Sequence, residues 1–286
     1  MKLDEECKGC LFNSQMKKVE REQSDENKLK EFKDGVRRLC QTAPADYCAP
    51  LLMRDIDGLH REIFGSGIDY SREKFMFNSA LLKLEDDIYA SVASSRDPLE
   101  SALKFASAAN YIDFARISDL NEDSVNYVLE TSKKADIDKA VLSQLKERLE
   151  TSETLCFLHD NCGEIVLDKI LIRIIKQLYP QISVTSVVRG QPIINDVTET
   201  DAGQVGLENY ARVVNNGSSV PGTYLKEISG EAKKIIDGSD IIISKGLGNL
   251  ETLYGVVKAF FAFTCKCGHI ARCFNLKLWS AGFIYG

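Results

Sequence analysis

The sequence predicts an α/β protein, with a mainly helical N-terminal part over residues 1–150 and an α/β core with a mostly parallel sheet over residues 151–286. Three observations support this prediction. Apolar residues recur at helical spacing in the first part, short apolar runs alternate with a long amphipathic stretch in the second, and polar residues follow those runs. The length of 286 residues exceeds the roughly 100–200 of a usual domain, so one large domain or two parts are expected.

The helical prediction for the first part rests on two apolar sets with intervals of three and four residues. They are Leu29, Phe32, Val36 and Leu39, followed by Phe77, Leu81, Leu84, Ile88 and Val92. A further helix is expected to begin at Asp97-Pro98, because proline is favoured at the first helical position. Its apolar stripe continues in phase to Asn110 and Asp113, which places two polar residues on an inward face. Substrate binding and the bridging of buried backbone both explain them, and the sequence leaves both open.

The second part contains short apolar runs that read as buried strands. They cover residues 155–158, 182–188 and 241–243, with a further strand expected at 260–264. Between the first two, residues 164–178 carry their apolar side chains on one broad helical face. Strand, helix and strand at this spacing indicate parallel strands joined by a crossover helix.

Composition and charge exclude several classes of protein. With 44% hydrophobic and 27% charged residues, the chain is expected to be globular rather than disordered. The net charge of −6 offers no attraction for polyanions, so nucleic acid is not an expected partner. The acidic start and the lack of an apolar run of about 18 residues argue against a signal peptide and a membrane span, and a cytoplasmic location is expected. The sequence does not indicate the oligomeric state.

Polar residues gather where three of the expected strands end. The turns cover residues 159–164, 189–198 and 244–251. The carboxyl ends of parallel strands share one edge of the sheet, and ligands bind in the crevice there. Geometry alone therefore predicts that the functional site lies at this edge of the sheet.

The residue types in these turns indicate a metal ion and a phosphate. Asp160, Asn161 and Asp196 are hard oxygen donors, which suit Mg²⁺ or Mn²⁺ better than a structural zinc ion. Lys245 stands beside Gly246 and precedes Gly248, so an ammonium and unobstructed backbone N–H groups are available to cradle a phosphate.

Plainer explanations exist for each of these signals. The helix that starts at Gly163-Glu164 offers a second site for an anion, but the Asp-Asn pair before it, taken alone, is more often a turn or helix cap. His159 is more simply a structural histidine than a general base, and we do not include it among the catalytic residues.

Nine cysteines, an odd number, indicate reduced thiols or metal ligands rather than a disulfide framework. The pairs Cys7-x-x-Cys10 and Cys265-x-Cys267 form a possible second metal site or a thiol site. Neither the spacing nor the number of neighbouring ligands decides among a metal, a redox pair and plain buried thiols.

Several motifs in this order resemble those of the metal-dependent damage-control phosphatases, once known only as a domain of unknown function. The long motifs are Asp160-Asn161-x-Gly163-Glu164, Arg189-Gly190-x-Pro192-Ile193-x-Asn195-Asp196-Val197-Thr198 and Asp240-Ile241-Ile242-Ile243-Ser244-Lys245-Gly246-x-Gly248-Asn249-x-Glu251. The likeness extends to Asn110-x-x-Asp113, Pro221-Gly222-Thr223 and Lys266-Cys267. Cys7-x-x-Cys10 resembles the mainly prokaryotic branch of the family.

The resemblance implies a helical N-terminal part packed on a Rossmann-like three-layer core. It also implies one divalent metal ion, Mn²⁺, Ni²⁺, Co²⁺ or Mg²⁺, held by Asp160, Asn161 and Asp196, with phosphate bound by Lys245. Family members are regarded as hydrolysing phosphate monoesters of small metabolites, such as sugar phosphates and damaged or side-product metabolites. The expected catalytic residues are Asp160, Asp196 and Lys245. Those expected to bind substrate or phosphate are Asn110, Asp113, Gly163, Glu164, Arg189, Lys245, Gly246, Asn249 and Glu251.

The expected chemistry follows from the charge of the substrate. A phosphate monoester is a dianion, so its hydrolysis needs cations and a nucleophile in line with the leaving group. The nucleophile is either a metal-activated water or a carboxylate that forms an acyl phosphate. Asp160 on the metal would be poorly placed to attack, so water is favoured, with Asp113, Glu164 or Asp196 to orient it or accept its proton.

Three other functions are compatible with parts of the sequence. A haloacid-dehalogenase-type phosphatase needs Asp-x-Asp after its first strand, whereas Asn161 and Cys162 follow Asp160. A carboxyl methyltransferase that uses S-adenosylmethionine shares the Rossmann-like architecture, but residues 159–163 contain one glycine instead of a glycine-rich turn. A thiol- or metal-binding sensor module would instead use the four paired cysteines. The substrate itself is not readable from the sequence.

Overall fold

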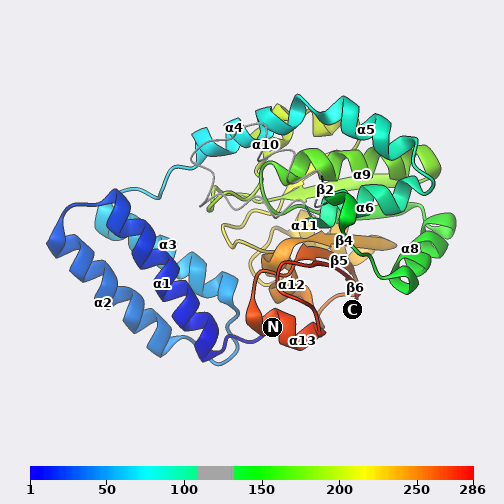
Figure 1. The fold of residues 1–286 in the computed structure, drawn as a ribbon. Helices are drawn as coiled ribbons and strands as arrows, with labels where there is room; N and C mark the ends of the chain where they lie inside the picture. Colours follow the sequence, from blue (N-terminus) through cyan, green and yellow to red (C-terminus); the bar gives the residue numbers. More distant parts are fainter. Residues whose placement is uncertain (109–129, 131) are drawn as a thin grey trace.

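The computed structural model describes residues 1–108, 130 and 132–286. Its N-terminal region is helical, as the apolar spacing predicts (Figure 1). The helices are α1 (Glu5–Glu22), α2 (Glu26–Thr42), α3 (Ala49–Phe64), α4 (Ser71–Leu82), α5 (Glu85–Ala93), α6 (Pro98–Ala108) and α8 (Lys139–Thr151). The predicted start at Asp97-Pro98 is confirmed, because α6 begins at Pro98.

The second half forms a six-stranded sheet with its helices. The strands are β1 (Thr154–Leu158), β2 (Ser183–Val188), β3 (Arg212–Asn215), β4 (Ile241–Lys245), β5 (Phe260–Thr264) and β6 (Ala281–Tyr285). They are joined by α9 (Glu164–Leu178), α10 (Glu199–Gln204), the 3₁₀ helix η2 (Leu207–Asn209), α11 (Gly230–Gly238), α12 (Gly246–Leu253) and α13 (Gly268–Phe274). The spatial order is β3-β2-β1-β4-β5-β6, parallel except for β6, which is antiparallel to β5. The predicted fold class, with its mostly parallel sheet, is confirmed.

Alternate residues of β1 enter different hydrophobic clusters, which shows that both faces of the sheet are covered. Leu155 and Phe157 pack in the cluster that contains α9 and residues of α4, α5 and α6. Cys156 and Leu158 pack in the cluster that contains residues of α11, α12 and α13. In Figure 1, α9 lies above the sheet while α12 and α13 lie below it, which gives the three-layer core.

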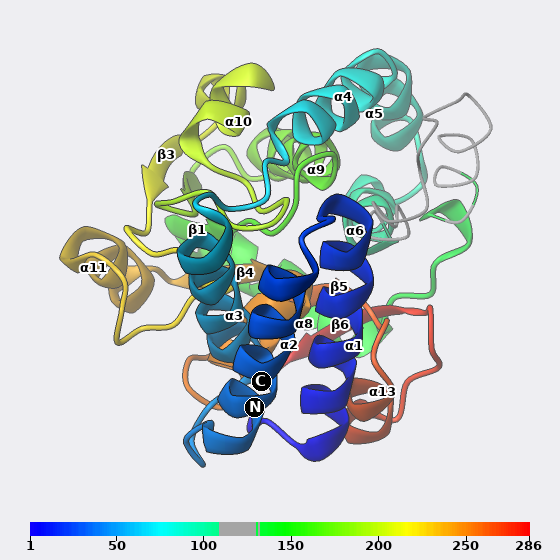
Figure 2. The ribbon, with the colours of Figure 1, turned by 90° about the vertical axis from the view of Figure 1, so that its left-hand side faces the viewer.

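Helices α1, α2 and α3 form a separate bundle with its own small core around Phe32, Val36 and Ile56. Figure 2 shows the three helices side by side in front of the sheet. The bundle reaches the sheet layer through α3, which packs against α12, and Leu51 of α3 contacts the loop residue Val220. By contrast, α4, α5 and α6 pack in the large core that covers the sheet. The helices of the first half therefore belong to two different hydrophobic cores. The predicted division at residue 150 stays a prediction.

Four of the six strands and α9 lie where the sequence predicts them, while β3 and β6 were not predicted. These two strands stand at the edges of the sheet, and most of their residues are only partly buried or exposed. Within the described parts of the chain, no helix is both long and apolar enough to span a membrane.

Candidate active site

The polar turns meet where the order of the strands reverses. Strands β1 and β4 are neighbours, but the chain continues from β1 towards β2 and from β4 towards β5, in opposite directions across the sheet. Asp160 follows β1 by two residues, and Lys245 is the last residue of β4. This reversal is the position at which open α/β sheets bind ligands.

The turns after β1 and β2 are held together by their backbones. The N–H of Val197 donates to the carbonyl of Asp160 at 2.8 Å, and the N–H of Cys162 donates to the carbonyl of Asn195 at 2.9 Å. Asn161 and Asp196 form an isolated antiparallel bridge. Asp196 is therefore adjacent in the fold to Asp160 and Asn161, although it is distant from them in sequence.

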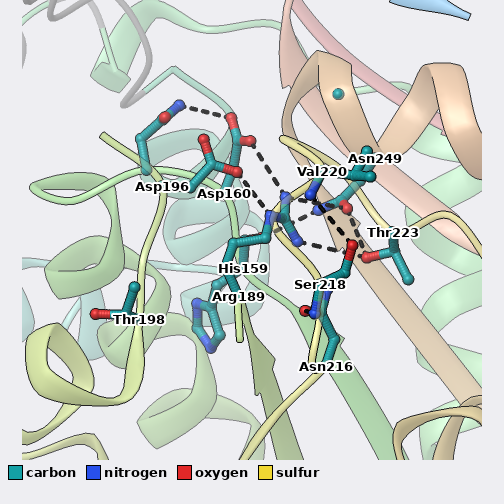
Figure 3. Close-up of polar contacts among 12 residues, drawn as sticks. His159, Asp160, Arg189, Asp196, Thr198, Asn216, Ser218, Val220, Thr223 and Asn249 are labelled. Atoms are coloured by element: carbon teal, nitrogen blue, oxygen red, sulfur yellow. Dashed lines mark hydrogen bonds and ion pairs between the residues drawn. The ribbon is translucent and has the colours of Figure 1, made fainter. Parts of the chain in front are cut away.

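Arg189 fixes the orientation of Asp196. Its guanidinium is 1% exposed, and Nε donates to Asp196 Oδ2 at 2.7 Å while Nη2 lies 3.9 Å from Asp160 Oδ1. Figure 3 shows both carboxylates turned towards this guanidinium. Nη2 also donates to Asn249 Oδ1 at 3.3 Å. The prediction that Arg189 binds substrate or phosphate stays a prediction, and its guanidinium holds Asp196 and Asn249.

Lys245 lies beneath the turn, paired with two carboxylates of α9. Its Nζ is 2.7 Å from Asp168 Oδ1 and 3.3 Å from Glu164 Oε2, and its side chain has no exposed surface. The amide nitrogen of Asn161 donates to Glu164 Oε1 at 3.0 Å and to Asp160 Oδ2 at 2.6 Å. One hydrogen-bonded network thus links Lys245, which is predicted to bind phosphate, to the residues predicted to bind the metal.

His159 lies on the far side of Asp168 from Lys245. Its Nδ1 is 3.1 Å from Asp168 Oδ2, and its Nε2 is 3.0 Å from the hydroxyl of Ser186. Burial lowers the pKa of His159, which favours the neutral ring. Its contacts are those of a buried histidine with both nitrogens satisfied.

The network holds more buried negative charge than positive charge. Four carboxylates, those of Asp160, Glu164, Asp168 and Asp196, face the two cations Arg189 and Lys245, so full ionisation leaves an excess of two negative charges. Burial, and next the charges of Asp196 and Glu164, raise the pKa of Asp160 well above its ordinary range. Burial also raises the pKa values of Asp196 and Glu164. A divalent cation would balance this charge, and its addition would favour the ionised carboxylates.

The donor set fits a hard divalent metal ion. Asp160 and Asp196 offer carboxylate oxygens, and the Oδ1 of Asn161 is a third oxygen donor beside them. In the described residues, no group of three or more His, Cys, Asp and Glu side chains is arranged to hold a metal. The candidate set is compatible with this result because its third donor is an amide.

Two glycines at the site have a positive φ, and one of them permits a close backbone approach. Gly246 has φ +78°, and a Cβ there would lie 1.9 Å from Asp160 Oδ2. Gly163, with φ +81°, precedes the first residue of α9. The glycine at 246 therefore lets the start of α12 lie against the carboxylate of Asp160.

Asn249 and Glu251, predicted to bind substrate or phosphate, occupy different surroundings. Asn249 Nδ2 donates to the carbonyls of His159, at 3.0 Å, and Lys245, at 2.8 Å, so it ties the ends of β1 and β4 together. Glu251 instead accepts a hydrogen bond from the N–H of Ala49, at the start of α3. The structure thus brings Asn249 to the cluster and directs Glu251 to the helical bundle.

Asn110 and Asp113 lie outside the described residues. Two residues at the site were missed by the sequence analysis, Asp168 and Asn78. Asp168 has a sequence signal, since it lies four residues after Glu164 as a lone carboxylate among apolar residues of one helix. Asn78, which accepts from the N–H of Gly163 at 2.6 Å, has no local signal because its partner is 85 positions away.

The paired cysteines lie where α1 and α13 approach each other. His269 Nδ1 is 2.8 Å from Asp4 Oδ2, and Arg272 is paired with Glu6, so two contacts link the segments. All nine cysteines are free thiols. Burial raises the pKa of Cys10, with a further contribution from Cys267, which indicates that these two thiols are near each other. The role of Cys7, Cys10, Cys265 and Cys267 as a metal or thiol site stays a prediction.

Comparisons with known proteins agree with the motifs. The sequence model of a family described as the damage-control phosphatase ARMT1-like domain matches residues 3–278. A damage-control phosphatase of Pyrococcus horikoshii is 34% identical over 178 residues, 60% of each chain. A damage-control phosphatase of Archaeoglobus fulgidus is 28% identical over 287 residues, 95% of each chain. An uncharacterized protein of Methanocaldococcus jannaschii is 28% identical over 88% of this chain and 84% of its own length.

A solved structure shares the whole fold. The crystal structure of a DUF89 family protein from Pyrococcus horikoshii superposes with a TM-score of 0.86 at 25% sequence identity. The match covers 100% of this chain and 99% of the crystallised chain.

Proposed function

This chain belongs to the damage-control phosphatase ARMT1-like domain family, and we propose that it hydrolyses phosphate monoesters of small metabolites with the aid of a divalent metal ion. The family match confirms the resemblance seen in the motifs, and the names of the relatives support a phosphatase role. The metal ion and the substrate class are our proposal. The Cys-x-x-Cys assignment to the prokaryotic branch also stays a prediction.

The observation that carries the proposal is the meeting of Asp160, Asn161 and Asp196 in a network with two buried negative charges in excess. These three residues would hold the ion. When bound, a divalent ion such as Mn²⁺, Ni²⁺, Co²⁺ or Mg²⁺ supplies positive charge to the phosphate oxygens and activates the attacking water. Arg189 keeps Asp196 in place, because its Nε occupies one carboxylate oxygen and leaves the other for the ion.

Lys245 and the start of α12 are proposed to bind the phosphate. The ammonium is fixed by Asp168 and Glu164, so its charge needs no reorganisation when a dianion arrives. Glu164 is the described carboxylate best suited to orient the water or accept its proton, since it accepts from Asn161 and its pKa is raised by burial. Asp113 and Asp196 were also expected for this task. Asp196 is held by Arg189, and Asp113 lies outside the described residues.

The substrate is expected to be a small phosphorylated metabolite, such as a sugar phosphate or a damaged or side-product metabolite. Two features support small anionic substrates over nucleic acid. The net charge of the chain is −6, and the proposed phosphate site offers a single buried lysine rather than a basic surface. A cytoplasmic location remains part of the proposal.

The test measures phosphate release from para-nitrophenyl phosphate and a panel of sugar phosphates by metal-stripped protein resupplied with Mn²⁺, Mg²⁺, Co²⁺ or Ni²⁺. Asp160→Asn tests the proposed ligand, and Asp237→Asn is the matched control, because Asp237 is half-exposed on α11 in a surface pair with Lys233. We expect activity that depends on added metal, is reduced at least a thousandfold in Asp160→Asn and is unchanged in Asp237→Asn. Activity in the stripped protein without metal, or full activity in Asp160→Asn, would contradict the proposal.

No described feature favours the two alternative functions. The turn after β1 carries a buried carboxylate, Asp160, where the carboxylate of S-adenosylmethionine would approach. For a cysteine-based sensor, the test is phosphate release after Cys7 and Cys10 are replaced by serine. A phosphatase keeps its turnover in this variant, whereas a sensor has no turnover to keep.

A further inference from the structure

Helix α4 provides one hydrogen-bond acceptor to the turn that follows β1, the buried side chain of Asn78. Asn78 is 0% exposed, and its Oδ1 accepts from the N–H of Gly163 at 2.6 Å. Gly163 lies two residues after Asn161 and directly before α9, where backbone N–H groups lack helical partners. The side chain of Asn78 therefore fixes the end of the turn that carries Asp160 and Asn161.

The same amide also reaches the segment that follows β2. Asn78 Nδ2 donates to Gln204 Oε1 at 2.9 Å, and Gln204 is the last residue of α10. The Nε2 of Gln204 turns back to α4, where it donates to the carbonyl of Phe75 at 3.1 Å and to the hydroxyl of Ser79 at 3.2 Å. These contacts hold the amides of Asn78 and Gln204 in one orientation each.

A buried ion pair adds a second connection between α4 and α10. Lys74 Nζ lies 2.6 Å from Asp201 Oδ2, and both side chains are about one-tenth exposed or less. Asp201 Oδ2 also accepts from the N–H and the hydroxyl of Thr198, two residues after Asp196. These contacts fix α10 against α4. They also fix the segment that leads from Asp196 to α10.

We infer that α4 sets the spacing between the two metal-binding turns, and that Asn78 is a positioning residue for the proposed metal site. The inference rests on the proposed function, since it concerns the same ion. The amide oxygen of Asn78 holds the turn that carries Asp160 and Asn161. Its amide nitrogen binds Gln204 and so holds the segment that follows Asp196. Residues that orient metal ligands without touching the ion commonly change metal affinity 10- to 100-fold when replaced.

The experiment measures Mn²⁺ affinity of metal-free protein by calorimetric titration, with the urea midpoint of each variant recorded in parallel. Asn78→Ala is expected to bind Mn²⁺ about tenfold more weakly, because it frees the N–H of Gly163 and breaks the link to α10. Asn78→Asp is isosteric and keeps the oxygen that accepts from Gly163, but it loses the N–H donated to Gln204. It is expected to bind Mn²⁺ about threefold more weakly than wild type, and so to recover part of the affinity lost in Asn78→Ala. The control is Phe75→Ala, on the same helix with its side chain 61% exposed, and its affinity should not change.

Gln204→Ala provides an independent variant at a half-buried position, for use if Asn78→Ala does not fold. It removes the amide contacts between α4 and α10 but keeps the contact of Asn78 with Gly163 and the ion pair of Lys74 with Asp201. We expect Mn²⁺ affinity at least threefold below wild type. Wild-type affinity in folded Asn78→Ala or in Gln204→Ala would overturn the positioning role, even if the urea midpoint falls. Failure of the proposed function is a separate result, recognised when the wild-type protein itself neither binds Mn²⁺ nor releases phosphate.

Discussion

The ammonium of Lys245 lies 2.7 Å from Asp168 Oδ1, and both side chains are shielded from solvent. The other carboxylate oxygen of Asp168 lies 3.1 Å from His159 Nδ1. Asp168 is therefore held at both oxygens and in turn fixes the lysine. The ion pairs with Asp168 and Glu164 outweigh burial and raise the pKa of Lys245, so the lysine stays charged. The end of β4 thus carries a permanent, immobile cation.

Replacing Asp168 should weaken both the fold and the proposed reaction. Asp168→Asn keeps the shape but removes the charge nearest to Lys245, which leaves Glu164 as its remaining anionic partner. We expect unfolding free energy to fall by about 2–4 kcal/mol, because one partner of a buried pair is lost. We also expect kcat/KM for para-nitrophenyl phosphate to fall about 10- to 100-fold.

The measurements for this prediction are urea denaturation and steady-state kinetics at saturating Mn²⁺, with Asp237→Asn as the surface control. Unchanged kinetics in folded Asp168→Asn would mean that Lys245 needs no anchoring by Asp168. Unchanged stability would contradict the buried ion pair itself.

The main-chain path of the site was largely predictable from the sequence. Strand ends in a parallel sheet share an edge, so Asp160, Asp196 and Lys245 could be brought together from the order of strands and turns alone. The roles of Arg189 and Asn249 could not be predicted in the same way. Their contacts, with Asp196 and with the carbonyls of two neighbouring strands, depend on side-chain directions that local spacing does not encode.

Edge strands and long-range contacts account for the rest of what was missed. The short strand Arg212–Asn215 has mixed burial and no apolar run, so periodicity gives no signal for it. Asn78 reads as an ordinary polar residue of a helix until α4 packs on α9. Glu251 was predicted to be a site residue because it belongs to the same motif as Lys245. In the structure its carboxylate faces Ala49 instead.

Gly246→Ala should disrupt the proposed site directly. The added Cβ would lie 1.9 Å from Asp160 Oδ2, and φ of +78° is a conformation that residues with a side chain rarely adopt. We expect a loss of about 1–3 kcal/mol in stability and at least a hundredfold loss of phosphate release. Gly238→Ala is the control, since nothing lies within 4 Å of a Cβ at that position. Equal activity of the two variants would show that the start of α12 does not lie against Asp160.

The proposed metal ion should stabilise the protein more strongly as the pH rises. Burial raises the pKa values of Asp160, Asp196 and Glu164 in the metal-free fold, so these groups retain protons that the unfolded chain has released. Above the ordinary carboxyl range, their contribution therefore destabilises the metal-free fold as pH increases towards the raised values. Bound metal favours the ionised carboxylates and opposes this loss.

Thermal unfolding with and without Mn²⁺ at a series of pH values between 5 and 8 tests this linkage. At about one hundred times the dissociation constant, the ion should add about 2.7 kcal/mol, and the effect should shrink as the pH falls. Asp160→Asn should respond less to the ion at every pH. A stabilisation that is the same at pH 5 and pH 8 would contradict ligation by carboxylates of raised pKa.

Glu251 supplies a further pH-dependent contribution, away from the proposed metal ligands. It lies on α12, accepts from the N–H of Ala49, and is close to the N-terminal ammonium and to Asp4. Burial raises its pKa to about 7, and the ammonium and the hydrogen bond only partly oppose the shift. The ordinary value for an unfolded glutamate is about 4.3. Ionising this side chain in the folded protein therefore costs stability between pH 4.3 and 7, and the full loss is reached above pH 7.

Glu251→Gln should remove this loss, because glutamine keeps an oxygen for Ala49 but carries no charge. The variant and wild type should have similar stability near pH 4, and the variant should be more stable at pH 8 by at most about 4 kcal/mol. Urea denaturation of metal-free protein at pH 4, 6 and 8 measures the difference, and Glu231→Gln, an exposed glutamate of α11, is the control. If the gap between Glu251→Gln and wild type fails to widen with pH, the carboxylate is not held in a buried environment. Phosphate release should be unaffected in this variant, because Glu251 faces α3 rather than Asp160.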